Sequence, residues 1–363
     1  MRNRFFSKAA FGILAGLMIV IAGCGANGGD KDVSGNASSA ESSKEPGKLV
    51  VTSFGGAIEK TQKELIQEFE KEYNAKVDVI TLYSADALAK IRAEKNNPSI
   101  DVVQFSGGQE EIAAKEDLIM KIDSSKMGNL KDLYPGALNP DGYGPVYAYE
   151  ALGIIYNEQK ITTPPTSWED LWRPEYKGHV GLVDISNTYG NQFLAAIAKA
   201  NGGGEDNIQP GLDKIKTLLP NKAAIVKSSP EVGNLFAQEE AWIAPFDSGY
   251  AYTFGKQGQP IKFAAPKEGA VGIYVNAQVV KGSQNPELAQ KFIDFLLRPE
   301  SQKKSSEGFG FSPTNKKVEL SGDVKALIPS DEEAFNKLIK LDLKLVNANK
   351  SDWMERWSKL IAE

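Results

Sequence analysis

The sequence has one cysteine, Cys24, and one histidine, His179, among its 363 residues. One cysteine cannot form a disulfide within the chain or supply the several thiolates of a cysteine zinc site. One histidine excludes a multi-histidine metal centre, and any Ser-His-Asp triad would have to use His179. We therefore predict no catalytic residues, no metal site and no cofactor.

Positive charge is also scarce. Lys and Arg number 42 against 47 Asp and Glu, for a formal net charge of −5, and the part of the chain after residue 23 stands at −8. Proteins that bind nucleic acid neutralise phosphates with Lys and Arg, so no nucleic-acid partner is expected. The 340 residues after residue 23 exceed what one hydrophobic core usually holds, which predicts two lobes.

The N-terminus has the layout of a secretory signal, in which basic residues precede an apolar run from Ala9 to Gly23. This run is shorter than the roughly 20 apolar residues that span a bilayer. Its end, Ile21-Ala22-Gly23-Cys24, resembles the lipobox of bacterial lipoproteins. The resemblance implies a signal peptide over 1–23 and lipid on Cys24, with an unlipidated transmembrane anchor as the alternative.

Residues 24–47 contain mostly glycine, serine, asparagine and charged residues, with almost nothing that a core could bury. This composition predicts a flexible tether behind the lipidated cysteine. Beyond the tether we expect the first part of lobe one over 48–147 and lobe two over 148–270. Residues 271–363 are expected to return to lobe one and to end in C-terminal helices.

Three strand-turn-helix units follow one another in the first lobe. Apolar, β-branched runs at 49–52, 77–82 and 101–105 each precede a polar turn and then a segment with helical spacing. Successive units of this kind predict a mostly parallel sheet flanked by helices. Ligands of such sheets bind beyond the carboxyl ends of the strands, so the turns are expected to meet in one cleft.

The long β-rich stretch 146–157 interrupts this alternation, and we interpret it as a strand that crosses between the lobes. Strand patterns occur at 181–184 and 241–246, and each is followed by a polar turn, as in the first lobe. Patterns at 261–266 and 271–276 are interpreted as strands that lead back. Helices are predicted from Asn285, from Ser330, and around Trp353 and Trp357, whose spacing of four indicates core packing.

Four blocks of sequence carry a family resemblance: Thr52–Gly56, Ala151–Asn157, Thr166–Gly178 and Pro266–Gly269. They are similar to the extracellular solute-binding proteins of ABC importers, and most of all to the spermidine/putrescine-type family. The resemblance implies an α/β, type II periplasmic-binding-protein-like fold with mixed sheets flanked by helices and a ligand cleft between two lobes. It also implies lobe closure around a solute, docking on a permease, and no enzymatic activity.

Polyamine binders of this family hold ammonium groups with carboxylates and surround the methylenes with aromatic rings. Carried over by position, the tryptophan expected of the family falls on Ile273, and the carboxylate just after it falls on Val275. An aromatic position falls on Asp247, and two acidic positions fall on Thr188 and Asn191. With Asp247 as its one carboxylate, the predicted cleft matches a polyamine poorly.

The turns instead supply amide and hydroxyl donors for an anion, while Asp247 and tyrosines suit one ammonium. We therefore predict a small amine-containing or zwitterionic solute, and a genuine spermidine or putrescine ligand is the alternative. The candidate ligand-binding residues are Ser53, Phe54, Gly55, Gly56, Tyr83, Ser84, Ser106, Gly107, Asn187, Thr188, Tyr189, Asp247, Tyr250 and Tyr274.

Two other functional classes stay open. A ferric-ion binder would use adjacent tyrosines with histidine or carboxylate ligands, and here Tyr250 and Tyr252 would share a face only on a strand. An enzyme would need a nucleophile–base pair, whereas His179 lies where we predict the edge of a scaffold strand.

For the favoured class, the expected partners are a small-molecule solute, the membrane subunits of an ABC permease, and the membrane through the lipid anchor. The protein is expected to be a monomer on the extracytoplasmic face of the cell membrane, or in the periplasm.

Overall fold

The computed structural model describes residues 45–362 of the chain. The predicted signal peptide, Cys24 and nearly all of the predicted tether lie outside the described residues. The chain from Glu45 onward clusters as one unit. None of its described helices combines the length and apolar character needed to cross a membrane.

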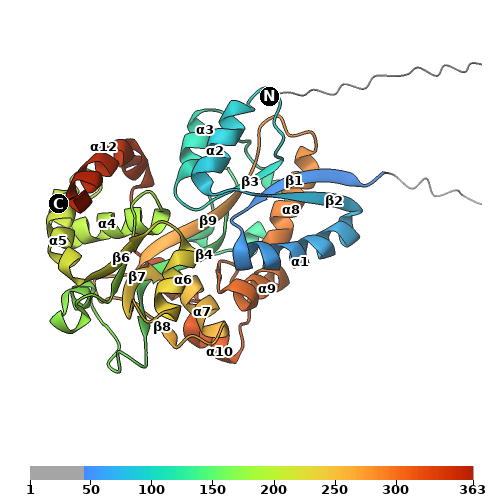
Figure 1. Cartoon of the computed structure of the whole chain (residues 1–363). Helices are drawn as coiled ribbons and strands as arrows, with labels where there is room; N and C mark the ends of the chain where they lie inside the picture. Colours follow the sequence, from blue (N-terminus) through green and yellow to red (C-terminus); the bar gives the residue numbers. More distant parts are fainter. Residues whose placement is uncertain (1–44, 363) are drawn as a thin grey trace, which may run out of the picture. The chain divides into compact units, whose positions relative to one another are not determined.

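A mixed β-sheet runs through this unit (Figure 1). Its strands are β1 Gly47–Ser53, β2 Ala75–Thr81, β3 Val102–Phe105, β4 Val146–Asn157, β5 Val180–Val183, β6 Lys222–Val226, β7 Ile243–Asp247, β8 Ile261–Ala264, β9 Val271–Val279 and β10 Ser312–Pro313. The order across the sheet is β2-β1-β3-β9-β4-β7-β5-β6, and β8 and β10 both pair with β4 beside this path.

The α-helices of the described residues are α1 Gly56–Tyr73, α2 Ser84–Ala93, α3 Gln109–Lys115, α4 Thr188–Ala200, α5 Gln209–Leu218, α6 Ser229–Ala237, α7 Ser248–Lys256, α8 Pro286–Leu296, α9 Pro299–Phe309, α10 Gly322–Leu327, α11 Glu332–Lys337 and α12 Leu343–Ala362. Short 3-10 turns lie at Ser124–Lys126, Leu130–Asp132, Pro135–Ala137, Trp168–Trp172, Pro174–Tyr176 and Leu219–Asn221.

The sheet consists of two parallel groups joined by antiparallel strands. In one group β1 pairs in parallel with β2 and β3, and in the other β5 pairs in parallel with β6 and β7. Between them β9 runs antiparallel to β3 and β4, and β4 runs antiparallel to β7. The expected α/β fold with a mixed, helix-flanked sheet is confirmed.

Strand β4 connects the two groups. Its residues 146–152 pair with β9, while residues 152–156 pair with β7. The stretch interpreted from sequence as a crossing strand thus lies in the centre of the sheet, between β7 of one parallel group and β9, which pairs with β3 of the other.

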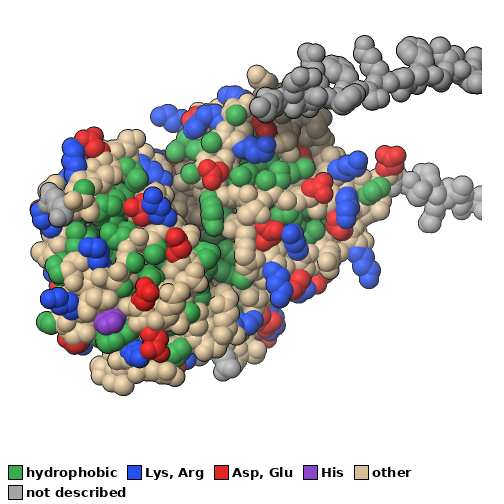
Figure 2. Space-filling view, viewed as in Figure 1, with side chains coloured by type: hydrophobic (Ala, Val, Ile, Leu, Met, Phe, Trp, Pro, Cys, Tyr) green, Lys and Arg blue, Asp and Glu red, His purple; other side chains and the backbone are tan. Residues whose placement is uncertain are grey.

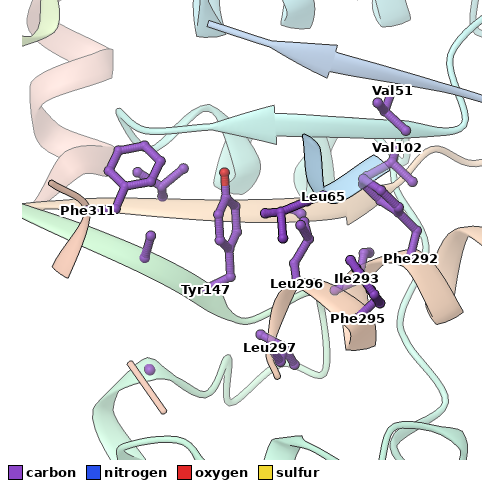
Figure 3. Close-up of a cluster of buried hydrophobic side chains, with 14 of the residues drawn as sticks. Val51, Leu65, Val102, Tyr147, Phe292, Ile293, Phe295, Leu296, Leu297 and Phe311 are labelled. Atoms are coloured by element: carbon purple, nitrogen blue, oxygen red, sulfur yellow. The ribbon is translucent and has the colours of Figure 1, made fainter. Parts of the chain in front are cut away.

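Apolar side chains cover both faces of the sheet because successive strand residues point to opposite faces. In β3, Val102 packs under α1, α8 and α9, while its neighbour Val103 packs under α2 and α3. In β4, Ile154 packs with α4, α5 and α12, while Ile155 packs with α6 and α7. Figure 3 shows the cluster under α8, where Phe292, Phe295 and Leu296 meet side chains of the sheet.

Three elements differ from the sequence-based expectations. The residues after the strand at 243–247 form helix α7, although the sequence was interpreted there only as a turn. Strand β6 and helix α9 were not predicted. Helix α9 contains Ser305, Ser306 and Gly308 and has little apolar periodicity, so packing against α1 rather than local propensity determines it.

The tryptophan pair near the C-terminus lies in the core, as predicted. Trp353 and Trp357 on α12 are both almost fully buried, and the Trp357 indole N–H donates to Asp184 Oδ2 over 2.9 Å. This contact holds α12 against the turn that follows β5.

Phe292 offers a test of the core under α8. It is fully buried and meets Phe69 edge-to-face with 5.1 Å between ring centroids. Phe292→Ala is expected to lower the free energy of unfolding by about 3–5 kcal/mol, because it removes buried apolar surface and leaves a cavity. Leu138→Ala, at a side chain 43% exposed, is the control and should change it little. Equal denaturant midpoints for the two variants would contradict this view of the core.

Candidate functional site

The carboxyl ends of all six strands in the two parallel groups lead to one cleft, as expected for sheets of this kind. The cleft has a volume of about 310 Å³ and is open to solvent. Figure 2 shows the surface hollowed between the side that carries α1 and α2 and the side that carries α4 and α6. The residues that line it are Phe54, Ile58, Tyr83, Ser84, Ala85, Asp86, Ser106, Gln109, Glu150, Ser186, Asn187, Thr188, Tyr189, Lys227, Ser228, Ser229, Tyr250, Val275, Phe311 and Lys350.

The structure brings more than half of the candidate residues together in this cleft. Those that line it are Phe54, Tyr83, Ser84, Ser106, Asn187, Thr188, Tyr189 and Tyr250. Two positions reached by the family carry-over, Thr188 and Val275, line it as well. The other three carry-over positions, Ile273, Asn191 and Asp247, are buried and do not line it, and Ile273 packs in the core with α4 and α5.

The remaining candidates lie near the cleft without lining it. Gly55 and Gly56 have φ of 81° and 58° and begin α1, and Ser53 is fully buried at the end of β1. The Gly107 carbonyl accepts a hydrogen bond from Asn347 of α12. Tyr274 points to the face opposite Val275 because the two are neighbours on one strand, and its ring meets Phe335 at 5.5 Å.

Asp247 lies behind the cleft wall and is fully buried. Its Oδ1 accepts from the Tyr250 backbone N–H at 2.9 Å, so the side chain caps helix α7. Its Oδ2 has no hydrogen-bond partner. Asp247, the carboxylate predicted to bind a ligand ammonium, therefore lies near the cleft. A second acid lies between Asp247 and the cleft.

That second acid is Glu150, in the middle of β4. It is 2% exposed, and its Oε2 accepts from the Tyr189 hydroxyl at 3.1 Å. Its Oε1 has no partner. A Cβ added at Gly249 would lie 2.6 Å from this Oε1 and 3.2 Å from Asp247 Oδ1, so both carboxyl groups converge on the same glycine.

Within residues 45–362, no Lys or Arg forms an ion pair with either member of this carboxyl pair. Burial raises the pKa of Glu150 well above its ordinary value, and the adjacent Asp247 raises it further. Burial likewise raises the pKa of Asp247 to about 6, against the lowering effect of the backbone N–H groups of α7. The pair is therefore a buried acid site that lacks a cation.

Aromatic rings surround the carboxyl pair. Tyr189 meets Phe246 with centroids 4.8 Å apart, and Tyr250 meets Phe309 edge-to-face at 5.2 Å. Phe54, Tyr83 and Phe311 also line the cleft. Rings next to carboxylates are the environment that a ligand ammonium with an attached carbon chain prefers.

The cleft also carries polar groups away from the pair. Ser84 and Ser106 lie with their hydroxyl oxygens 3.3 Å apart, and the Ser106 N–H donates to Ser84 Oγ. Asp86 on α2 is an exposed acid of the lining, while Lys227 and Lys350 are its two cations. Positive and negative groups are thus both present.

Glu150 is the functional residue that the sequence-based prediction missed. Its signal was a glutamate inside the run Val146–Ile155, which is otherwise apolar apart from tyrosine hydroxyls. An acid in a strand with apolar residues on both faces is buried, and a buried acid without a partner marks a ligand site. Lys350 was missed too, since it is far from every strand end in the chain.

The two other functional classes find no support at this site. Tyr250 and Tyr252 lie on helix α7, where two positions correspond to about 200° of rotation, and the Tyr252 hydroxyl donates to the Glu307 carbonyl. The two tyrosines therefore do not share a face. A ferric site would have required them to lie on a strand, where residues two apart point to the same side. Residues 45–362 contain no cluster of three or more His, Cys, Asp or Glu side chains able to hold a metal.

The single histidine lies outside the cleft. His179 directly precedes β5, and its ring stacks on Trp242 with centroids 3.6 Å apart. Figure 2 shows it on the surface away from the hollow. Its contacts are those of a scaffold residue, as predicted.

Comparison with known proteins identifies the family. Residues 64–335 match the model of a family described as bacterial extracellular solute-binding protein. This chain belongs to that family. It is 31% identical, over 82% of its length and 88% of the relative's, to the spermidine/putrescine-binding periplasmic protein of Escherichia coli (strain K12). It is 27% identical, over 74% of its length and 77% of the relative's, to the gamma-aminobutyric acid-binding protein of Pseudomonas aeruginosa.

Solved structures agree with this assignment. The spermidine/putrescine ABC transporter substrate-binding protein of Streptococcus pneumoniae superposes with a TM-score of 0.72 at 25% identity, covering 87% of this chain and 98% of the other. An ABC transporter structure from Clostridium perfringens gives 0.72 at 27% identity, covering 86% and 99%. The solute-binding protein described here is an ABC-transporter substrate-binding protein homologous to polyamine-binding proteins. Its family and fold are those of transport proteins, not of enzymes.

The carboxyl pair predicts an unusual pH dependence of stability. Raised pKa values mean that the folded protein holds protons that the unfolded chain loses, so stability falls as the pH rises from about 4 through 6 and above. Glu150→Gln removes one acid and gives Asp247 an amide donor. Without ligand, the variant should therefore be more stable than the wild type at pH 8, by on the order of 2–3 kcal/mol, with a smaller difference at pH 5.

Chemical denaturation at both pH values measures this difference. Glu333→Gln, at an exposed glutamate on α11, is the matched control and should show no such trend. If the free energy of unfolding changes equally between pH 5 and pH 8 in Glu150→Gln and in the wild type, the carboxyl pair does not hold a proton in the folded state.

Proposed function

We propose that this substrate-binding protein binds a small amine-containing or zwitterionic organic solute and delivers it to an ABC permease. The observation that carries the proposal is the buried, cation-free carboxyl pair of Glu150 and Asp247 at the wall of the cleft. A ligand ammonium placed at Glu150 would supply the missing counter-charge.

The relatives support an amine as the common ligand feature. Three of them are named for the binding of spermidine and putrescine, of putrescine and cadaverine, and of gamma-aminobutyric acid. These compounds share a primary ammonium on an alkyl chain and differ at the other end. The carboxyl pair and the aromatic rings around it would bind the ammonium end that these compounds share.

We infer that binding works by closure of two lobes around the solute. Strands β4 and β9 are the central strands that join the two parallel groups, so they are the elements at which bending would occur. The lobes would comprise residues 48–147 with 271–363, and residues 148–270. The closed form would then dock on the permease as a monomer.

A genuine polyamine ligand is the second candidate, and one observation favours it. Asp86 lines the cleft in addition to Glu150, so two acidic positions are available where the sequence-based prediction counted one. A diamine could then place its second ammonium at α2.

The first prediction of this proposal concerns the ligand. The chain from residue 25 onward keeps the whole unit from Glu45, and thermal shift on it should detect at least one amine among diamines, ω-amino acids, aminophosphonates and opines. A ligand at a hundred times its Kd stabilises by about 2.7 kcal/mol. Glu150→Gln and Asp247→Asn should each weaken binding more than tenfold, since loss of one partner of a buried charge pair costs about 2–5 kcal/mol.

Affinity should also fall between pH 7.5 and pH 5, because protonation of Asp247, whose pKa is about 6, competes with the ligand ammonium. Glu333→Gln is again the control variant, and the N-acetylated form of the active compound is the control ligand. If the acetylated compound binds equally well, or if Glu150→Gln keeps full affinity, ammonium recognition at this pair is wrong.

The second prediction concerns localisation. We propose that Cys24 carries a lipid that anchors the mature protein to the membrane on its extracytoplasmic face. Since Cys24 is the single cysteine, Cys24→Ala should abolish incorporation of radiolabelled fatty acid in a bacterial host and release the protein from the membrane fraction. Unchanged labelling of the variant would exclude lipidation at this site.

A further inference from the structure

Helix α12 places a lysine where its pattern calls for an apolar residue. Its buried face carries Val346, Trp353, Trp357 and Leu360, at spacings of seven, four and three residues. Lys350 falls four after Val346 and three before Trp353, on that same face. It is half-buried and lines the cleft.

Lys350 also differs from the other basic residues of its helix. Lys344 pairs with Glu111, Arg356 with Asp352, and Lys359 with Glu355, all within 4.0 Å. No hydrogen bond or ion pair is found for Lys350 among the described residues. Burial lowers its pKa, and no acid offsets that effect. A half-buried ammonium without a counter-charge is costly unless a ligand neutralises it.

Anion-binding groups lie on the same side of the cleft as Lys350. Trp357 of α12 donates to Asp184 Oδ2, and Asp184 Oδ1 accepts from both the backbone and the hydroxyl of Ser186. The turn after β5 is thus held against α12. Its next residue, Asn187, donates to the Lys227 carbonyl at 3.2 Å, which ties Lys227 to the same wall.

This wall supplies donors and positive charge. Ser186, Asn187, Lys227 and Ser228 line the cleft there together with Lys350. The hydroxyls of Ser186 and Ser228 already donate to Asp184 and Glu231. The donors left for a carboxylate, phosphonate or sulfonate are therefore the ammonium groups of Lys227 and Lys350 and the second N–H of the Asn187 amide. The acid pair on β4 and β7 has the opposite charge. The lining of the cleft therefore carries both acidic and basic groups.

We propose that the solute is a zwitterion whose ammonium lies at Glu150 and whose anionic group lies at Lys350. The inference rests on the proposed function, because it takes the ammonium end from there and assigns the other end. A diamine would bring its second ammonium toward a half-buried, unpaired lysine. The competing acid, Asp86, is exposed, so water screens its attraction for that ammonium.

Matched ligand pairs test the inference. Putrescine and 4-aminobutyrate, or cadaverine and 5-aminopentanoate, share one ammonium and a similar length but differ in the charge of the other end. Calorimetry on the chain from residue 25 should give the wild type a preference of roughly tenfold or more for the amino acid of at least one pair. 2-Aminoethylphosphonate extends the series to a shorter, phosphonate-bearing zwitterion.

Variants then assign the preference to a residue. Lys350→Met should remove the preference by weakening the amino acid at least tenfold without weakening the diamine, and Lys350→Arg should keep it. Lys359→Met, on the exposed face of the same helix, is the control and should leave both affinities unchanged. Since Lys350→Met removes an unpaired half-buried charge, its melting temperature should equal or exceed that of the wild type, which separates loss of recognition from loss of folding.

The outcomes distinguish the two proposals. Diamine binding that is tighter than amino acid binding, unaffected by Lys350→Met and abolished by Asp86→Asn, would overturn the zwitterion and leave the amine-binding function intact. Equal affinities within each pair, unchanged by Lys350→Met, would overturn it as well. Failure of every amine to bind would overturn the proposed function and the inference with it.

Discussion

Two acids buried side by side, without a cation, are the constraint around which this cleft is arranged. Glu150 comes from the strand that joins the two parallel groups, and Asp247 from the end of a strand in one of them. Tyr189 donates to one acid and the N-terminus of α7 to the other. These donors meet part of the demand of the two carboxyl groups, which also hydrogen-bond to each other when one of them is protonated.

The fold makes this arrangement possible through its mixed topology. The two parallel groups run in opposite directions, and the six polar turns at their carboxyl ends meet at the cleft. The antiparallel pair β4 and β9 instead crosses the middle of the sheet, so a side chain from the interior of a strand, Glu150, reaches the same cleft. Burial there raises the pKa of both acids. The same buried acids that would attract a cation therefore lower the stability of the ligand-free protein when they are ionised.

The C-terminal helix contributes a basic residue to the lining of the cleft. Its apolar face packs against the helices of the second parallel group, while Asn347 donates to the Gly107 carbonyl in the turn after β3. One residue of this packed face, Lys350, is charged and faces the cleft. Acid on the β4 side and base on the α12 side give the cleft a polarity that suits a ligand with two different ends.

The sequence by itself determined the elements whose signal is local. Alternating apolar runs and polar turns predicted most strands and the convergence of their ends, and the spacing of Trp353 and Trp357 predicted their burial. It also pointed to Asp247, but as a direct ligand rather than as the acid behind Glu150. Only the tertiary structure decided that Glu150 and Lys350 line the same cleft. The reason is physical, because an acid in mid-strand and a lysine near the C-terminus acquire a role only when folding buries them beside one cavity without partners.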